Sequence, residues 1–163
     1  MSDAIYYSVL GFAFCLSYAG IFFLFRFFFR DHSRMSERAI AAAAGTTLGF
    51  LVLTNIFYYI VPDHELQNRL LHAFGGGFLL FVVCFLVARD LATRIDRVRF
   101  FIFSFFIVTT LGVVNEIAEL LLHLYFGMSY ATNPLDTAFD LVSNTLGALL
   151  AAACVLPFYK RIK

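Results

Sequence analysis

Two groups of polar residues in the second half of the chain are spaced so that each would form one stripe along a helix. The first group is Glu116, Glu119 and His123, and the second is Asp136, Asp140 and Asn144. Side chains three and four residues apart are neighbours on a helix surface. Carboxylate and imidazole groups collected in this way can hold a divalent cation or transfer protons. The two stripes therefore predict either a metal site or an acid–base site.

A third stripe and one isolated amide occur earlier in the chain. Arg69 and His72 lie three residues apart, and Asn55 lies alone in an apolar stretch. We predict that Glu116 and Asp140 act as bases or metal ligands and that His72 acts as an acid or a ligand. The candidates for binding a ligand are Arg69, Asp136, Asn144 and Asn55.

The metal interpretation has five candidate ligands. These are His72, Glu116, Glu119, His123 and Asp140. Their spacing matches neither the HExxH motif nor the Glu-x-x-His motif of di-iron bundles. Without a cation, several acids at short range in a low dielectric cannot all be ionised, which suits a proton relay. A divalent metal and metal-free acid–base chemistry therefore both stay open.

Several of these residues also have ordinary structural interpretations. Asp136 lies just after a proline and would serve as an acid at a helix start. Arg69 would either neutralise Asp136 or Asp140, or bind an anionic phosphate. Asn144, with Gly147 after it, would form a close contact between two membrane helices.

The composition places these polar groups in a membrane protein. Of the 163 residues, 61% are hydrophobic, 14% are charged and 22 are phenylalanine. The mean hydropathy is +0.84. A soluble domain is roughly 45–50% apolar and 25% charged. We expect membrane lipids as partners, and no nucleic acid, because the formal net charge is +1 and no polybasic face is visible.

Five apolar runs are long enough to cross a bilayer, whose core takes about 20 helical residues. They extend over residues 4–29, 40–61, 66–88, 100–126 and 135–159. The first run is longer than the apolar part of a signal peptide and follows an acid, so we expect a retained helix. Short breaks force consecutive helices into antiparallel contact. The prediction is an all-α protein with a single transmembrane domain, 1–163, built as an antiparallel five-helix bundle.

The distribution of Arg and Lys predicts the side that each loop faces. RDHSRMSER, RDLATRIDRVR and the C-terminal YKRIK are basic, whereas PDHEL and GMSYATNP contain no Arg or Lys. Basic segments stay in the cytoplasm. We therefore expect the C-terminus in the cytoplasm of a bacterial cell, with the protein in its inner membrane. The N-terminus and the loops PDHEL and GMSYATNP would lie outside, with residues 63–65 simply solvated.

This topology would bring the polar groups of four helices to one level. Glu116 and Glu119 would lie roughly 24–29 Å along the fourth run, at about 1.5 Å per residue. The third and fifth runs start outside, which places His72 and Asp136 in the same layer, and Asn55 near the outer end of the second run reaches a similar height. A charge at the bilayer centre costs about 2.5–3.5 kcal/mol, so such stripes should face one another and water. We expect an acidic cavity that is open to the outside.

Two further residue types have structural explanations. Cys15, Cys84 and Cys154 lie in apolar runs without a CxxC pattern, so we expect them to be buried and unpaired. The phenylalanines at 22–29 surround the end of the first run and should pack against both lipid and protein.

Part of the sequence resembles a known family. HAFGGGFLLFVV, then Glu116, then DTAFDLVSNTLGALLAA resemble the VanZ-like family of small bacterial membrane proteins, and EIAELLLHLYFG leading into DTAFDLVSNTLGA is similar to the related, uncharacterised YjdF-like group. The matching positions are His72, Glu116, Asp136, Asp140, Asn144 and Gly147. Glu119 stands where many VanZ-like chains have glutamine, and the arginine often seen before the aspartate pair is absent. The resemblance implies a role at the cell envelope, where one VanZ-like member is linked to low-level teicoplanin resistance.

Three functions are consistent with the sequence, and whether the protein is an enzyme stays open. The first is an outward-facing site that binds or processes the head group of an envelope lipid or amphiphile, with Arg69 as anion handle and Asn144 as orienting group. The second is a proton-coupled transport module that uses the same acids. The third is an accessory subunit of a larger membrane complex, in which the acids form structural pairs. The sequence also leaves a homo-oligomer open.

Overall fold

The computed structural model describes residues 3–30, 34–93, 95–127 and 134–159, and within these ranges the regular structure is entirely helical. The elements are α1 (Asp3–Phe29), α2 (Glu37–Ile60), α3 (His64–Leu71), the π-helical segment η1 (His72–Leu79), α4 (Leu80–Asp90), α5 (Arg97–Phe126), α6 (Pro134–Val155) and the 3₁₀ turn η2 (Leu156–Phe158). Because α3, η1 and α4 form one span, five helices are long and apolar enough to cross a membrane. The prediction of an all-α, five-span protein is confirmed.

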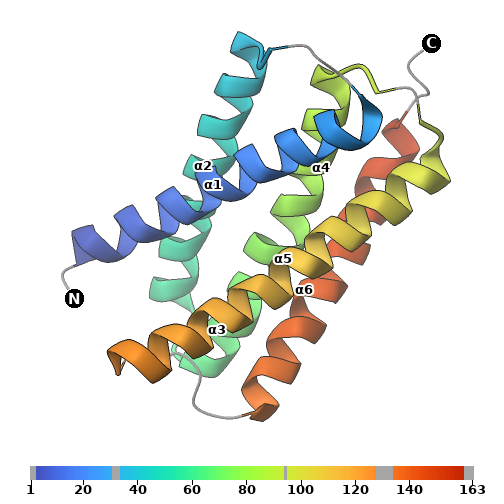
Figure 1. Cartoon of the computed structure of the whole chain (residues 1–163). Coiled ribbons are helices and arrows are strands. Elements are labelled where there is room, and N and C mark those ends of the chain that lie inside the picture. The colour runs from blue at the N-terminus through green and yellow to red at the C-terminus, as the bar shows by residue number, and fades with distance from the viewer. Residues whose placement is uncertain (1–2, 31–33, 94, 128–133, 160–163) are drawn as a thin grey trace.

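The α3–η1–α4 span lies at the centre of the arrangement. In Figure 1, α1 and α5 run obliquely across α2, the central span and α6. The central span packs against each of the other four. α1 and α5 also meet directly, since the ring of Phe103 on α5 lies 5.0–5.2 Å from the rings of Phe25, Phe28 and Phe29 on α1. Polar side chains in the middle of the central span, such as His72, are therefore buried, whereas Glu65 and Arg89 near its ends are exposed.

The orientation of the bundle in the membrane remains a prediction. Residues 128–133, in the loop expected outside the cell, and residues 160–163, at the end expected in the cytoplasm, lie outside the described residues. The described spans do alternate in direction, so α3 and α6 begin, and α5 ends, at one and the same end of the bundle (Figure 1). We call this the polar end.

Three helix starts are fixed by capping side chains. Ser36 precedes α2, Asp63 precedes α3 and Asp96 precedes α5, and each accepts a hydrogen bond from a backbone N–H in the first turn. The spans consequently begin earlier than the predicted starts at 40, 66 and 100. Residues 63–65 are exposed, as expected, but the prediction that they form a loop is wrong, because Asp63 is the cap and the next two residues begin α3.

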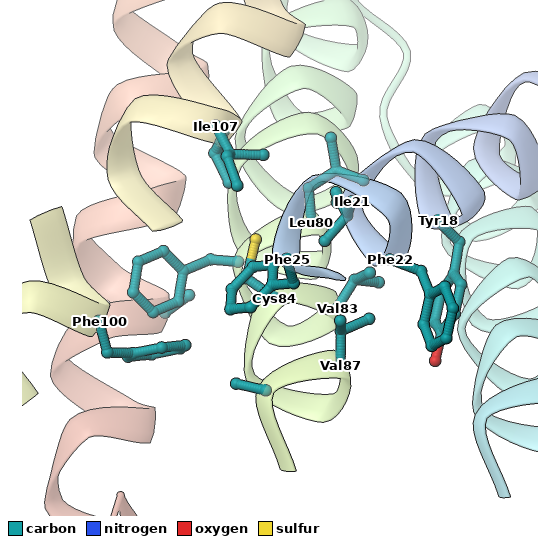
Figure 2. Packing of buried hydrophobic residues seen from close by; sticks show 14 of the residues in the cluster. Tyr18, Ile21, Phe22, Phe25, Leu80, Val83, Cys84, Val87, Phe100 and Ile107 are labelled. Atoms are coloured by element: carbon teal, nitrogen blue, oxygen red, sulfur yellow. The ribbon is translucent and has the colours of Figure 1, made fainter. Parts of the chain in front are cut away.

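The apolar core lies at the end opposite the polar end. Figure 2 shows Phe22 and Phe25 of α1 together with Val83 and Val87 of α4 and with Phe100 of α5. All five side chains are fully buried or within 1% of it. Large rings from α1 thus fill the space over the central span, as close packing in a protein interior requires.

The segment that follows α6 packs against this core. The ring of Tyr159 stacks on Phe100 with centroids 4.4 Å apart. The backbone carbonyl of Tyr159 accepts a hydrogen bond of 2.8 Å from Nε of Arg97 at the start of α5. These contacts hold α5 and α6 together at the end away from the polar residues.

Apolar side chains also cover the outside of the bundle. Phe22 and Phe25 are buried, which confirms that this run packs against protein, and Phe23 and Phe27 are exposed on the outside of the bundle, where the prediction places lipid. The prediction for the cysteines is wrong in part, because Cys84 is buried but Cys15 and Cys154 are exposed. Lipid accepts apolar side chains as readily as the protein core does, so an apolar run in a membrane helix does not indicate burial. All three cysteines are unpaired, as expected.

Candidate functional site

Three titratable side chains from three different spans meet near the polar end. His72 Nδ1 lies 3.7 Å from Oε1 of Glu116 on α5, and His72 Nε2 lies 3.5 Å from Oδ2 of Asp140 on α6. One possible metal-ligand atom from each residue lies within 4.8 Å of the other two. The structure therefore brings together the three residues that the sequence predicted as the chemical centre. We call them the histidine–carboxylate cluster.

The cluster is more enclosed than the sequence suggested. His72 is 9% exposed, Glu116 is 7% exposed and Asp140 is 1% exposed. The expectation of an open cavity is wrong for these side chains, because η1 and α6 pack directly against each other and α5 packs against both. Only His72 and Glu116 keep a small exposed area, so the cluster reaches the surface of the bundle there.

Glycines allow η1 and α6 to approach this closely. Gly147 on α6 lies against the backbone carbonyl of Ala73, and Gly77 on η1 lies against the backbone of Asn144. A Cβ atom at either glycine would overlap backbone atoms that no side-chain rotation can move. The prediction that Gly147 serves close packing between membrane helices is confirmed.

Asn144 is held inside this contact, beside the cluster. Its Nδ2 lies 3.3 Å from Nδ1 of His72. Its Oδ1 lies over Gly76, and its Nδ2 is 2.9 Å from where a Cβ would stand at Gly112. With 2% of its surface exposed, the carboxamide occupies room that three spans leave for it and is fixed against the imidazole.

Asn68 contacts the cluster and is absent from the set proposed from the sequence. Its Nδ2 donates a hydrogen bond of 2.9 Å to Oδ2 of Asp140. Asn68 lies four residues before His72 on the same span, so helical spacing alone would have placed it on the stripe with His72.

The backbone around His72 is also unusual. The π-helical segment η1 starts at His72 and continues to Leu79. Such segments are rare and often occur at functional sites. A π-helical turn holds more residues than an α-helical one, so the side chains after His72 are rotated relative to those of α3. The hydrophobic pattern of this stretch did not predict it.

Arg69 and Asp136 lie at the edge of the cluster. Arg69 forms an ion pair of 3.3 Å with Glu65, and its guanidinium lies 4.4 Å from the ring centre of Phe139. Among the described residues it forms no ion pair with Asp136 or Asp140, so its charge acts on Asp140 only from beyond ion-pair distance. Asp136 is half-buried in the first turn of α6, where an acid suits the helix start.

Three of the predicted site residues lie away from the cluster. Glu119 accepts a hydrogen bond of 2.7 Å from Asn115, and His123 lies half-exposed a turn further along α5. The last turns of α5 are exposed on most sides, which carries this stripe away from the other spans. Asn55 accepts a hydrogen bond of 3.1 Å from the hydroxyl of Tyr7 and so joins α2 to α1.

His72 is the one basic side chain of the described residues within ion-pair distance of the two carboxylates of the cluster. No Lys or Arg in the part of the chain that the structure describes lies within ion-pair distance of Glu116 or Asp140. Oε1 of Glu116, Oδ1 of Asp140 and Oδ1 of Asn144 are buried without a hydrogen-bond partner. Uncompensated carboxylates are costly to bury, so protons or a cation must neutralise them. The geometry suits either one, with the imidazole as a ligand or as a bridge for protons.

These features define a polytopic α-helical membrane protein with a buried polar centre. The chain belongs to the DUF2238 family, described as predicted membrane protein, and the family model matches residues 1–161. The match confirms the likeness to the YjdF-like group and does not extend it to VanZ-like proteins. Neither a curated protein nor a solved structure matches the chain.

Proposed function

We propose that the histidine–carboxylate cluster binds the phosphate-containing head group of an envelope lipid or amphiphile and hydrolyses its phosphate ester. The observation that carries the proposal is the imidazole of His72, which has a carboxylate at each ring nitrogen, at 3.7 Å and 3.5 Å. An imidazole and a carboxylate in contact supply the acid and the base that hydrolysis needs. Their place inside a bundle of membrane spans suits a substrate that resides in the bilayer.

The reaction requires one base and one acid. In the proposed step Glu116, the more exposed carboxylate, takes a proton from water while the water oxygen bonds to phosphorus. The bond between phosphorus and the alcohol oxygen breaks, and protonated His72 gives its proton to that oxygen. A proton then passes from Glu116 to His72, which restores both groups. Asp140, held by Asn68, orients the imidazole from its other side.

Arg69 would hold the phosphate of the head group. It lies one turn before His72 on the same span, its side chain is 35% exposed, and its Nε is buried without a hydrogen-bond partner. An arginine with free N–H groups suits a phosphate anion. Asn144 would keep His72 in place, since its carboxamide is fixed by the surrounding glycines.

The proposed location is the bacterial inner membrane, with the polar end outside the cell. The basic segments at the opposite end support this orientation through the positive-inside rule.

Hydrolysis can be measured in proteoliposomes made from a total polar lipid extract of a bacterial envelope. We expect the protein to produce a free head group or its phosphate, detected by mass spectrometry. Glu116→Gln and His72→Gln should lower the rate by about 10²–10⁴-fold, the usual contribution of general acid–base catalysis. The matched control is Glu119→Gln, a carboxylate on the same helix outside the cluster, which should keep the rate. Equal turnover by empty liposomes, or by all variants, would contradict the proposal.

A second candidate function is proton-coupled transport. The observation that favours it is the same pair of contacts, because a proton could pass from Glu116 through the two nitrogens of His72 to Asp140. In proteoliposomes with a pH gradient, this function predicts a proton flux that Glu116→Gln abolishes and Glu119→Gln leaves intact. A flux equal to that of empty liposomes would exclude it.

A further inference from the structure

The histidine–carboxylate cluster has the geometry and the missing charge of a metal site. Protein ligands bind zinc at about 2.0–2.2 Å, so two ligand atoms on one ion lie at most about 4.3 Å apart. The contacts of His72 with Glu116 and Asp140, at 3.7 Å and 3.5 Å, fall within this limit, but they involve different ring nitrogens, so one carboxylate must move toward the nitrogen that binds the ion. One atom from each residue lies within 4.8 Å of the other two, so small side-chain rotations would place all three around one ion.

The charges of the cluster point to a divalent ion. Two carboxylates and a neutral imidazole together carry the charge that one divalent cation cancels. The described part of the chain offers them no Lys or Arg within ion-pair distance, as noted above. A cation would therefore neutralise the site without any change in the packing of the three spans.

Unpartnered atoms in the cluster independently indicate a ligand. Asn144 is only 2% exposed, and its Nδ2 lies 3.3 Å from Nδ1 of His72. Its Oδ1 has no hydrogen-bond partner. Oε1 of Glu116 and Oδ1 of Asp140 are unpartnered as well. Ionised carboxylate oxygens accept hydrogen bonds or bind cations and donate nothing. A cation between Glu116 and Asp140 would satisfy both unpartnered carboxylate oxygens, whereas Oδ1 of Asn144 faces Gly76.

The surroundings of His72 resemble those of a metal-binding histidine. Only one ring nitrogen can bind an ion, and the other normally contacts a carboxylate or a carbonyl oxygen. His72 has Glu116 and Asn144 beside Nδ1 and Asp140 beside Nε2, so each nitrogen has an oxygen-bearing partner. Asn68 in turn donates to Asp140. Such outer partners hold the ligands in orientation.

We infer that His72, Glu116 and Asp140 bind one divalent transition-metal cation of the zinc or manganese type. Imidazole suits zinc and carboxylates suit manganese, so a mixed set favours this class over calcium or magnesium alone. The inference deepens the proposed function, on which it rests for the role of the site. With the ion bound, His72 and Glu116 would be ligands and no longer the acid and base of the step above, and the ion would lower the pKa of a bound water and so supply the nucleophile near neutral pH.

The test is a titration of the full chain in detergent with Zn²⁺ and, separately, with Mn²⁺. The protein is purified without a histidine tag and treated with a chelator, and it carries Cys15→Ser and Cys154→Ser because exposed thiols also bind zinc. Calorimetry should give saturable binding of about one ion per chain for at least one of the two metals. Glu116→Gln and Asp140→Asn, which keep the side-chain shapes, should each weaken binding by at least about 10–100-fold.

Two comparisons make the result decisive. Glu119→Gln should weaken binding far less than the two cluster variants, because Glu119 acts on the site only through its charge and is not a ligand. The metal should raise the melting temperature of the parent and not that of Glu116→Gln, because an ion that binds only the folded state stabilises it. Absence of saturable binding by both metals, or equal binding by all the variants, would overturn the inference. Metal binding without lipid hydrolysis would contradict the proposed function alone, and hydrolysis by metal-free protein would contradict this inference alone.

Discussion

Asp140 and Glu119 both accept a hydrogen bond from an asparagine, and their burial makes the two bonds unequal. Asn68 donates to Asp140 at 2.9 Å, and Asn115 donates to Glu119 at 2.7 Å. Asp140 is 1% exposed, so water cannot replace its donor, whereas the Asn115 bond is exposed. A buried acceptor that loses its partner keeps the full desolvation cost.

The pair of asparagines gives a prediction about single residues. Asn68→Ala should lower the free energy of unfolding by about 1–3 kcal/mol, because Oδ2 of Asp140 loses its donor. Asn115→Ala should change it by less than about 0.5 kcal/mol, as surface substitutions usually do. Chemical unfolding in detergent measures both. An equal loss in the free energy of unfolding in the two variants would contradict the prediction that the buried hydrogen bond to Asp140 contributes more than the exposed one to Glu119.

At the scale of elements, the contact of η1 with α6 positions the cluster. Gly147→Ala should destabilise the protein by about 1–3 kcal/mol, the usual cost of overpacking, because the new methyl group meets the backbone of Ala73. Gly49→Ala is the matched control, since a Cβ there has no heavy atom within 4 Å. Alanine is the better helix former, so the control should be neutral or slightly stabilising. Thermal unfolding compares the two, and a neutral Gly147→Ala would contradict the close approach.

The start of α5 gives a prediction about pH. The backbone N–H of Arg99 donates to the Asp96 carboxylate, which lowers the pKa of Asp96 below its ordinary value. A folded-state pKa below the unfolded one adds stability above the unfolded pKa, and this stability is lost as pH falls through the folded pKa. Asn caps helices about as well as Asp. Asp96→Asn should therefore match the parent near pH 7 and lose less stability in acid. Melting temperatures measured from neutral to acidic pH should diverge, and parallel curves would contradict the assignment.

Local pattern explains which elements and site residues could be predicted. The spans follow from their apolar length, and His72, Glu116 and Asp140 follow from acids and imidazole at membrane depth. The π-helical turn at η1 does not follow from the sequence, because the hydrophobic pattern of residues 72–79 fits an α-helix equally well. The exposure of Cys15 was missed because lipid and protein core accept the same side chains. Glu119 lies on the same helical stripe as Glu116, so the sequence could not distinguish the two. In the structure Glu119 is outside the cluster and contacts Asn115 on its own helix.

The whole molecule separates two kinds of packing along its length. Aromatic and aliphatic side chains fill the core around α4 (Figure 2), and the buried polar side chains of the cluster lie towards the other end. Apolar packing holds the spans together in the core. Near the polar end, close contacts at glycines and side-chain hydrogen bonds hold them together. For the proposed function, the polar end must face the side of the membrane from which the substrate enters.

Orientation is accordingly a prediction for the whole molecule. The basic segments RDHSRMSER, RDLATRIDRVR and YKRIK should stay in the cytoplasm. A green fluorescent protein fused to the C-terminus should fluoresce in a bacterial host, and alkaline phosphatase at the same position should be inactive. The opposite pattern would place the cluster on the cytoplasmic half of the membrane.

The central claim is that polar side chains from three separate spans form a single site around His72. A double-mutant cycle with Glu116→Gln and Asp140→Asn, followed by chemical unfolding in detergent, tests it most directly. Each carboxylate contacts the same imidazole, so we predict that the double variant departs from the sum of the single variants by about 0.5–3 kcal/mol. Additivity within about 0.3–0.5 kcal/mol would mean that the two carboxylates act independently, and it would contradict the account.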